Sequence, residues 1–504
     1  MKTILHASQV KKLDELTINE YGIDNLILME KAALQVAELV KGYLQTSESK
    51  RVLVVSGSGN NGGDGIACAR ILALCGYDVD LVDICTGRAC AAHDKQLEIF
   101  AKYGFSYLTS LDKVSYDKDI VVDALFGIGL NRPLNQELCD VISRMNQIKG
   151  YKIAVDIPSG LNSDTGNSMG AVFKADKTIT FSYLKPGLLI RDGKLNAGSI
   201  SVADIGIYCF NQYESERMLL FENVDFKWPK RNANAHKGSV GKVTVIAGDS
   251  QISGACVLCA EAVLRAGAGM VKIITHANHR EIIGTRLPEA LTCYYNDEEC
   301  LSDDIMDAID FGSVIIIGPG IGKSNYSKEL LNYVLTKTSK PLVIDADAIS
   351  LIATDQNLFE ILKIESTKRN IVLTHHLLEF SRLSNISMDD LKEDVISCIK
   401  VFQKQLNAVI VLKDSRTFVF TTNSHIYFID SGCSALATAG SGDVLSGIMG
   451  SFMIQNGMNQ PFESVLNAVY LHGALGERIA VKRGNEYTCL AGDLCEELKT
   501  SEWR

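Results

Sequence analysis

A glycine-rich run that could hold a phosphate group follows the first strongly apolar segment of the chain. The segment RVLVVS (51–56) enters GSGNNGGDG (57–65), and IACARILAL follows with helical spacing. Gly57, Gly59 and Gly62 fit G-x-G-x-x-G, in which backbone N–H groups at a helix N-terminus bind phosphate. Asp80 or Asp83 lies at about the distance downstream that a dinucleotide-binding fold requires. This pattern alone would indicate a dehydrogenase that holds NAD as a coenzyme.

Two later loops carry side chains that hydride transfer does not require. Asp123 lies near the end of the strand-like segment DIVVDALF, and Asp156 and Ser159 lie at the end of YKIAVDIPS. Because loops at the carboxyl ends of parallel strands converge on one crevice, we expect these side chains to meet the glycine-rich run. Asn61, Asp123 and Ser159 supply oxygen ligands suited to an alkali or alkaline-earth cation, and Asp156 is a candidate general acid or base. A single loop Asp more often caps a turn, but three loops of this composition favour a site.

The second half of the chain carries its strongest chemical signal in AGSGDVLSG, residues 439–447. The N–H groups of Gly440 to Asp443, at the start of a helix-like run, would form an anion hole. An Asp held there can accept a proton from a hydroxyl group while the hole stabilises a transferring phosphoryl group. The alternative is an ordinary glycine-rich helix start with Asp443 near the N-cap. Four further motifs favour the phosphoryl-transfer reading: GPGIG (318–322), DADAI (345–349), THHLLEFSRL (374–383) and VLKDSRT (411–417).

Alternating strand-like and helix-like segments must position these loops. Two helices are expected within residues 8–45. Strand-like runs follow at 51–56, 77–84, 119–126, 151–157 and 177–183, and a second series occupies 241–249, 269–276, 313–320, 340–347, 370–376 and 407–414. Two β-rich runs and three helical stretches close the chain. Such alternation predicts two α/β domains with parallel sheets covered on both faces. The pattern breaks around residues 210–231, which we expect to be the interdomain segment.

Composition narrows the classes of partner and compartment. The chain has 504 residues and a formal net charge of −10, which argues against a nucleic-acid surface. No apolar run approaches the roughly 18 residues that span a bilayer, and the start is too polar for a signal peptide, so we expect a cytoplasmic protein without a membrane partner. The 14 cysteines, among them Cys68, Cys75, Cys256 and Cys259, are expected to be buried reduced thiols.

The loops of the first half resemble the signature loops of NAD(P)H-hydrate epimerases, in GNNGGDG, VDALFGIGL and VDIPSG. That family interconverts the R and S hydrates of NADH and NADPH, which are epimeric at C6 of the nicotinamide. The resemblance implies a Rossmann-like, doubly wound domain over residues 1–220, potassium at Asn61, Asp123 and Ser159, and proton transfer by Asp156. It assigns hydrate binding to Asn60, Asn61, Gly62, Gly63, Asp64, Gly127, Ile128, Gly129, Leu130, Asn131, Arg132, Pro133 and Asp156. Lys185, in YLKPGLLI, is expected to be a solvated loop lysine rather than a basic neighbour of the site.

The motifs of the second half resemble NAD(P)H-hydrate dehydratases, a branch of the ribokinase-like superfamily. In that family ADP or ATP, with magnesium, phosphorylates the C6 hydroxyl of the S hydrate, and loss of phosphate regenerates the dihydronicotinamide. The resemblance implies a ribokinase-like α/β domain over residues 225–504 with Asp443 as the catalytic base. It places the hydrate at Ala255, Gly320, His376 and Asp443, and the nucleotide at Lys413, Asp414, Ser415, Arg416, Thr417 and Gly442. ADP is the expected donor and a homo-oligomer the expected assembly.

Several positions depart from the patterns of these families. Met-Glu is more often followed by Asn-Ala-Gly, where this chain has Lys31-Ala32-Ala33. The usual Thr-Pro-His-Pro-Gly-Glu is THHLLE (374–379) here, so the loop is expected to take another path or to be strained. Asp414 stands where glycine is usual and would repel a phosphate unless it points away, and Gly432-Cys433 replaces Gly-Asn. His375 and His376 are adjacent on a strand and face opposite sides, so they are not expected to share a metal.

Three functions therefore remain open. The first is a bifunctional enzyme that epimerises NAD(P)H hydrates and then dehydrates the S form. The second is an active epimerase with a decayed dehydratase domain that acts as a nucleotide-binding or regulatory module. The third is a small-molecule kinase of the ribokinase type fused to a nucleotide-binding domain, which would accumulate a phosphorylated product.

Overall fold

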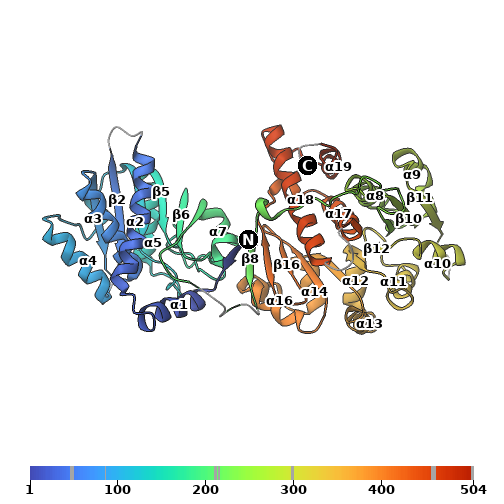
Figure 1. The fold of residues 1–504 in the computed structure, drawn as a ribbon, viewed down its shortest axis with the longest axis horizontal. Helices are drawn as coiled ribbons and strands as arrows, with labels where there is room; N and C mark the ends of the chain where they lie inside the picture. The colour runs from blue at the N-terminus through green and yellow to red at the C-terminus, as the bar shows by residue number, and fades with distance from the viewer. Residues whose placement is uncertain are drawn as a thin grey trace. The chain divides into compact units, whose positions relative to one another are not determined.

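The computed structural model of the chain divides into two units, Lys2–Glu214 and Ser215–Arg504 together with Met1. It describes residues 1–45, 50–85, 87–208, 213, 216–296, 300–455 and 461–500. Each unit contains a sheet with helices around it, coloured from blue to green and from green to red along the chain (Figure 1). The predicted α/β class with two sheets is confirmed. Among the described residues no helix is both long and apolar enough to cross a membrane.

The first unit is built on a parallel sheet in the order β3-β2-β4-β5-β6-β7. Its strands are β2 (Arg51–Gly57), β3 (Asp78–Ile84), β4 (Asp117–Ala124), β5 (Lys149–Val155), β6 (Lys177–Phe181) and β7 (Ser199–Ala203), and β1 (Lys2–Ile4) precedes them. The helical segments are α1 (Ala7–Asn19), α2 (Asn25–Leu44), α3 (Asn60–Leu74), α4 (Ala91–Lys102), η1 (Leu111–Lys113), α5 (Gln136–Gln147), α6 (Pro186–Leu189) and α7 (Arg191–Asn196).

Both faces of this sheet are buried, which explains the continuous apolar runs of its strands. Val52 and Val54 of β2 pack with α2 and α3, whereas Leu53 and Val55 face a second core that includes Ile142 of α5. The strand order reverses between β2 and β4, the switch point at which ligands bind in doubly wound sheets. The loops after β2 and β4 therefore open on one crevice.

The second unit has a mixed sheet in the order β8-β17-β16-β15-β14-β13-β12-β9-β10-β11, parallel from β15 to β11. The antiparallel pairs are β15–β16 and β16–β17. Its strands are β8 (Met218–Phe221), β9 (Lys242–Ile246), β10 (Met270–His276), β11 (Leu291–Tyr295), β12 (Val314–Ile317), β13 (Leu342–Asp345), β14 (Ile371–His376), β15 (Val409–Lys413), β16 (Phe418–Phe420) and β17 (Ile426–Ile429).

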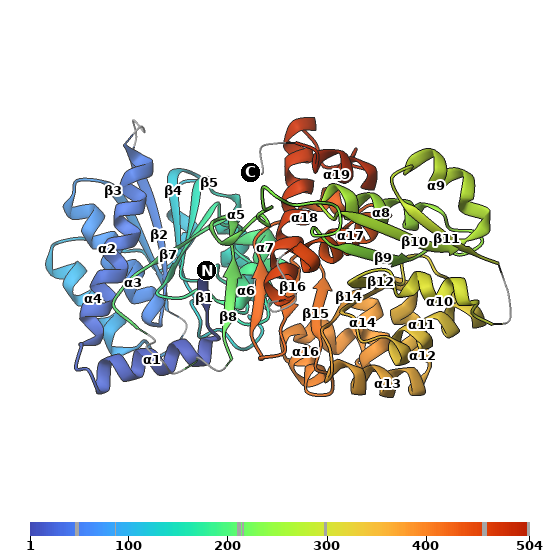
Figure 2. The ribbon, with the colours of Figure 1, turned by 45° about the vertical axis from the view of Figure 1, so that its right-hand side comes forward.

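Helices cover both faces of this second sheet. The helical segments are η2 (Asn223–Asp225), α8 (Gly254–Arg265), η3 (Ala277–His279), α9 (Arg280–Arg286), α10 (Asp303–Ile309), α11 (Asn325–Lys337), α12 (Ala346–Thr354), α13 (Gln356–Ser366), α14 (Leu377–Ser384), α15 (Met388–Glu393), α16 (Val395–Gln403), η4 (Ser434–Leu436), α17 (Ser441–Gln455), α18 (Pro461–Arg483) and α19 (Ala491–Glu497). Figure 2 shows α8 and α17 on one face of the sheet and α11 to α14 on the other. Residues of α8, α17 and α18 share one core with the valines and isoleucines of β9, β10 and β12.

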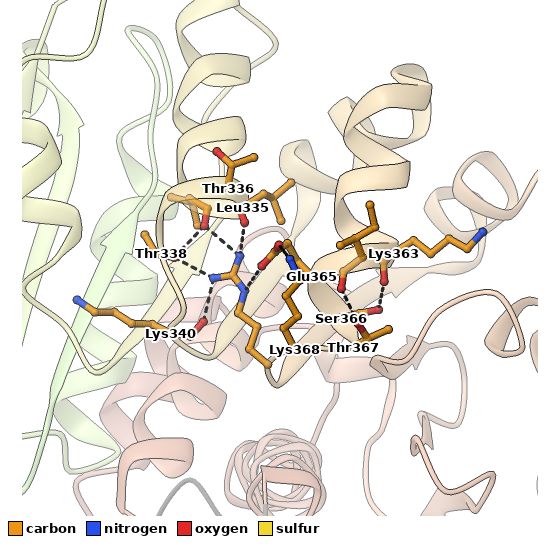
Figure 3. A network of polar contacts seen from close by, with 12 residues as sticks. Leu335, Thr336, Thr338, Lys340, Lys363, Glu365, Ser366, Thr367 and Lys368 are labelled. Carbon is orange, nitrogen blue, oxygen red and sulfur yellow. Dashed lines mark hydrogen bonds and ion pairs between the residues drawn. The ribbon is translucent and has the colours of Figure 1, made fainter.

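A buried guanidinium joins the end of α11 to the end of α13. Arg369 donates to the carbonyl oxygens of Val334 (3.1 Å), Leu335 (2.7 Å) and Lys340 (3.1 Å), and to Oγ1 of Thr338 (2.8 Å). Figure 3 shows these partners converging, with the Glu365 carboxylate beside them. The last carbonyls of a helix have no partner within it, so this arginine caps α11.

Some sequence predictions are corrected by the structure. The short strands β7, β8 and β11 were not expected, and β8 lies inside the segment 210–231 that was read as patternless. Residues 210–212, 214 and 215 of that segment lie outside the described residues. The described cysteines are free as expected, and Cys68, Cys256 and Cys259 are buried. The expectation of burial is wrong for Cys75, Cys85 and Cys300, which are exposed.

Candidate active sites

The glycines of the first loop let the backbone of α3 approach the sheet. A Cβ on Gly62 would overlap the carbonyl oxygen of Gly57, and a Cβ on Gly65 would overlap Cβ of Ala124. Gly59 is the N-cap of α3. The close approach of helix and strand is therefore the reason for glycine at these positions, and it directs the N-terminus of α3 toward the crevice.

A pocket of about 610 Å³ occupies this crevice. The loop after β2, the loop after β4, and helices α1 and α2 line it together with two residues that follow β5 and β6, Asp156 and Lys185. Of the residues predicted to bind the hydrate, it brings together Asn60, Asn61, Asp64, Gly127, Ile128, Gly129, Leu130 and Asp156. Gly62 and Gly63 are buried within α3, and Asn131, Arg132 and Pro133 are exposed; these five are not among the lining residues.

Asp156 and Lys185 form a buried ion pair in this pocket. Nζ of Lys185 lies 2.6 Å from Oδ1 of Asp156, and it also donates to Oγ1 of Thr180 (2.8 Å) and to the carbonyl oxygen of Phe181 (3.1 Å). Lys185 is only 1% exposed. The expectation of a solvated loop lysine is wrong, because α6 begins at the next residue and holds Lys185 under the end of β6.

The backbone of Asp156 adopts a left-handed conformation, with φ of 64°. Its N–H donates to the carbonyl oxygen of Ile179, which fixes this turn against β6. The described residues donate hydrogen bonds to Oδ1 of Asp156 and none to Oδ2. One carboxylate oxygen is thus held by three donors, and the other is available to a ligand in the pocket.

Further acidic groups from α1 and α3 line the same pocket. Burial, and next the charge of Asp156, raise the pKa of Asp64 well above its usual value, and burial raises the pKa of Asp14. Asp14, Lys11 and Glu15 of α1, Met29 of α2, and Ile205 and Ile207 beyond β7 also line the pocket and were not predicted. Their signal in the sequence was only helical or apolar spacing, which is shared by ordinary core residues.

Two of the three proposed cation ligands, Asp123 and Ser159, contact each other. Ser159 donates to Asp123 through Oγ (2.6 Å to Oδ1) and through its backbone N–H (2.7 Å to Oδ2). Asp123 is fully buried, and burial raises its pKa to about 6 although these hydrogen bonds lower it. Nδ2 of Asn61 is buried without a partner. A buried carboxylate that forms no ion pair with any described residue, next to the Ser159 hydroxyl group, fits a monovalent cation, whereas the unpartnered Nδ2 of Asn61 is a donor and is not itself a cation ligand.

The second site lies where β13, β14 and β15 end beside the start of α17. A pocket of about 480 Å³ is lined by Asp345, His376 and Lys413 from these strand ends and by residues 436–438 and 440–443, which include Asp443. Burial, and next the charge of Asp345, raise the pKa of Asp443 to about 7, although Lys413 opposes this rise. Gly440 has a φ of 88°, which allows the chain to turn into the helix.

A buried carboxylate holds side chains from β15 and α17 in place around this pocket. Asp345 is 1% exposed and accepts hydrogen bonds from Nζ of Lys413 (3.1 Å), Oγ of Ser446 (2.7 Å) and the backbone of Ala346 (2.8 Å). Nζ of Lys413 would lie 3.4 Å from a Cβ on Gly442, so the lysine reaches the first turn of α17. A helix N-terminus with a lysine beside it is a binding site for phosphate.

The altered THHLLE loop is neither strained nor irregular. β14 ends at His376, and α14 begins at the next residue. Nδ1 of His376 accepts from the backbone N–H groups of Leu378 and Glu379, and Glu379 accepts from the backbone of His376. His376 therefore caps the helix with a φ of −87°, so of the two expected outcomes, another path or strain, strain does not occur.

Two histidines near this pocket are buried and neutral. His375 stacks on Phe380, its ring nitrogens have no partner among the described residues, and burial lowers its pKa to about 3. Burial lowers the pKa of His472 to about 4, and its Nε2 donates to the carbonyl oxygen of Ser441 (2.9 Å). Among the described residues no cluster could hold a metal through histidine, cysteine and carboxylate ligands.

The other predicted residues of this unit lie away from the pocket lining. A Cβ on Gly320 would lie 3.1 Å from Cβ of Ala255, so these two residues pack together. Asp414 is exposed, and its carboxylate accepts from the backbone of Ser415. Arg416 pairs with Asp430 (2.8 Å) in the turn that contains Thr417.

Comparisons with known proteins cover both units. A family model described as NAD(P)H-hydrate dehydratase matches residues 243–500, and one described as YjeF-related protein N-terminus matches residues 25–187. A solved structure of the ADP/ATP-dependent NAD(P)H-hydrate dehydratase from Bacillus subtilis, co-crystallised with ATP/Mg²⁺, is 28% identical and covers 54% of this chain and 91% of its own, with a TM-score of 0.45.

Curated relatives align along nearly the whole chain. The bifunctional NAD(P)H-hydrate repair enzyme Nnr of Moorella thermoacetica is 32% identical over 98% of this chain and 96% of its own length. The enzyme of the same name from Escherichia coli is 30% identical over 99% of this chain and 93% of its own. With both units matched by family models and relatives aligned from end to end, the chain belongs to the family of bifunctional NAD(P)H-hydrate repair enzymes.

Proposed function

We propose that this chain repairs hydrated NADH and NADPH. The unit around residues 1–220 interconverts the R and S hydrates, and the unit around residues 225–504 uses ADP to dehydrate the S hydrate, with release of AMP and phosphate. The observation that carries the proposal is the placement of Asp156 and Asp443, each in a pocket at the carboxyl ends of parallel strands.

In the first pocket Asp156 is the proton-transfer group. Lys185, Thr180 and the N–H of Phe181 hold Oδ1, so Oδ2 is left for a bound hydrate. It takes the proton of the C6 hydroxyl group as the C6–N1 bond opens and N1 keeps the electron pair, and it returns the proton when the ring closes on the other face of C6. The N-terminus of α3 and the loop that contains Gly127 to Leu130 bind the dinucleotide. Asn61, Asp123 and Ser159 would hold a potassium ion, which supplies positive charge next to the buried carboxylate.

In the second pocket Asp443 accepts the proton of the C6 hydroxyl group as its oxygen attacks the terminal phosphoryl group of the nucleotide. The N–H groups of Gly442 and Asp443 in the first turn of α17, together with Nζ of Lys413, stabilise the transferred charge. The lone pair of the ring nitrogen then expels phosphate from C6, and loss of a proton from C5 of the resulting iminium ion restores the dihydronicotinamide. Magnesium enters with the nucleotide phosphates as part of that substrate.

One repair assay distinguishes this proposal from its alternatives. Mixed NADPH hydrates are incubated with Mg²⁺ and either ADP or ATP, and the absorbance band of the dihydronicotinamide is followed. Recovery of both epimers with release of phosphate supports the proposal. A stable phosphorylated product would instead identify a kinase, and interconversion of epimers without recovery would identify an epimerase with a decayed second unit. The homo-oligomer and the cytoplasmic location stay predictions from the sequence.

A further inference from the structure

A buried histidine lies directly behind the glycine-rich loop of the first unit. His93 belongs to the first turn of α4 and is 1% exposed. Its Nε2 lies 3.0 Å from Oδ1 of Asp83, at the end of β3, and its Nδ1 lies 3.2 Å from Oδ1 of Asp94. Oδ1 of Asp83 also accepts from Oγ of Ser56 (2.9 Å), the residue before Gly57.

These contacts determine the protonation of the ring. An ionised carboxylate only accepts hydrogen bonds, so a ring with a carboxylate at each nitrogen must carry a proton on both. The hydrogen bond to Asp83, followed by that to Asp94, raises the pKa of His93 against the effect of burial. The geometry therefore favours the doubly protonated form of His93, with one carboxylate at each ring nitrogen.

The start of α4 also holds the loop that lines the pocket. The backbone N–H of Cys90, the N-cap of α4, donates to the carbonyl oxygen of Ser58 (2.9 Å). Sγ of Cys90 donates to Oδ1 of Asn60 (3.3 Å), and Cα of His93 would lie 3.6 Å from a Cβ on Gly63. Ser58, Gly59, Asn60 and Asn61 all line the pocket. The residues from Cys90 to Asp94 thus brace the loop from behind.

We propose that His93 is a positively charged positioning residue for the hydrate-binding pocket. Its imidazolium ties Asp83 and Ser56, at the ends of β3 and β2, to the start of α4, and so holds residues 58–61 in the conformation that binds the dinucleotide. This inference rests on the proposed epimerase function. It gives Asp83 a role different from that of the ribose-binding acid of a dehydrogenase, because its Oδ1 is occupied by His93 and Ser56.

The charges that act on the ring are few. Asp83 faces it from β3 and Asp94 from its own helix, whereas Ser56 of β2 and Gly63 of α3 carry no charge. Because the pKa of His93 is raised, its contribution to loop position is complete below the usual histidine value of 6.5 and is lost as the pH rises through the raised value.

The charge is tested on the native protein by ¹⁵N-histidine NMR. The His93 resonances are assigned as those missing from His93→Gln. We expect both ring nitrogens to be protonated at pH 7, with a titration above that of a free histidine. A neutral ring at pH 7 would overturn the inference, and this measurement does not depend on whether the protein is an epimerase.

The positioning role is tested by epimerase kinetics on the full chain. We expect His93→Gln, which keeps one donor to Asp83 but loses the charge, to raise KM for the hydrate about tenfold with little change in kcat. The difference in KM between the native protein and His93→Gln should shrink as the pH rises through the pKa of His93 that NMR measures. Lys95→Ala is the matched control, since Lys95 lies on the same helix and pairs with Glu98 at the surface.

The outcomes separate the inference from the function on which it rests. An unchanged KM in a folded His93→Gln protein would overturn the positioning role. A fall in kcat as large as the rise in KM at every pH would overturn it as well. If His93→Gln fails to fold, Asp94→Asn replaces it and should lower both the NMR pKa of His93 and the pH at which KM rises. If the native protein does not epimerise hydrates, the proposed function fails. The positioning role is then tested by hydrogen exchange, which measures how far intact NADPH protects the amides of residues 58–61. Equal protection at pH values on both sides of the His93 pKa would contradict the positioning role.

Discussion

Replacing Lys185 with methionine tests how the first pocket is held together. The methionine fills the space of the lysine stem but removes the hydrogen bonds to Asp156, Thr180 and Phe181, and it leaves the Asp156 carboxylate buried without its cation. Breaking a buried ion pair at one side costs about 3–5 kcal/mol. For a unit of this size, about 2–4 °C of melting temperature is lost per kcal/mol, so the first unit should melt roughly 6–20 °C lower.

Differential scanning calorimetry on the full chain measures this change. We expect the transition of the first unit to fall while that of the second unit stays in place. Epimerisation should decrease at least about hundredfold, the lower range for loss of a positioned proton-transfer group, and dehydration of pure S hydrate with ADP should continue. The second activity then serves as an internal control for folding.

A double variant separates the electrostatic cause from simple loss of packing. In Lys185→Met with Asp156→Asn the buried charge is also removed, so the melting temperature should recover part of the loss while epimerisation stays absent. A double variant that melts no higher than Lys185→Met, or a single variant that melts like the native protein, would refute the reasoning.

Three further changes probe other parts of the molecule. Asp443→Asn should abolish dehydration and keep epimerisation, and a variant that still dehydrates contradicts the assignment of the base. Because the base must be deprotonated and its pKa is about 7, dehydration by the native protein should fall as the pH drops through about 7. Arg369→Met, which uncaps α11, should lower the melting temperature of the second unit by the equivalent of about 3 kcal/mol or more, while Lys368→Ala, at the exposed neighbour, should not. Asp347→Asn removes a charge that raises the pKa of Asp443, so the acid limb of the dehydration profile should move to lower pH; no movement would show that this charge is not felt at the base.

The sequence predicted the long buried strands because both of their faces are apolar. β2, β4 and β12 contain the unbroken runs VLVV, IVV and VIII and were found where expected. Two of the missed strands are short and partly exposed: β7 reads SISVA, and β11 reads LTCYY. Such segments become strands because a neighbouring strand offers unpaired backbone groups, which a local pattern does not reveal.

The site residues divide in the same way. The loops of Asp156 and Asp443 were predicted because each follows a recognisable strand or precedes a helix. Lys185 was misjudged because its burial depends on the pairing of β5 with β6 and on the left-handed turn at Asp156. His93 carried no signal, since its two carboxylate partners come from β3 and from its own helix and meet only in the folded unit.

The buried histidines give the two units opposite responses to acid. His375 and His472 are kept neutral in the second unit, so its unfolded chain takes up protons that the folded state refuses, and acid below about pH 6.5 draws that unit toward unfolding until their pKa values of about 3 and 4 are passed. His93 in the first unit binds its proton more tightly when folded, so that unit loses this contribution as the pH rises through the raised pKa of His93. Through these histidines a fall in pH works against the second unit and a rise in pH works against the first, so the two halves of one chain are weakened from opposite ends of the pH scale.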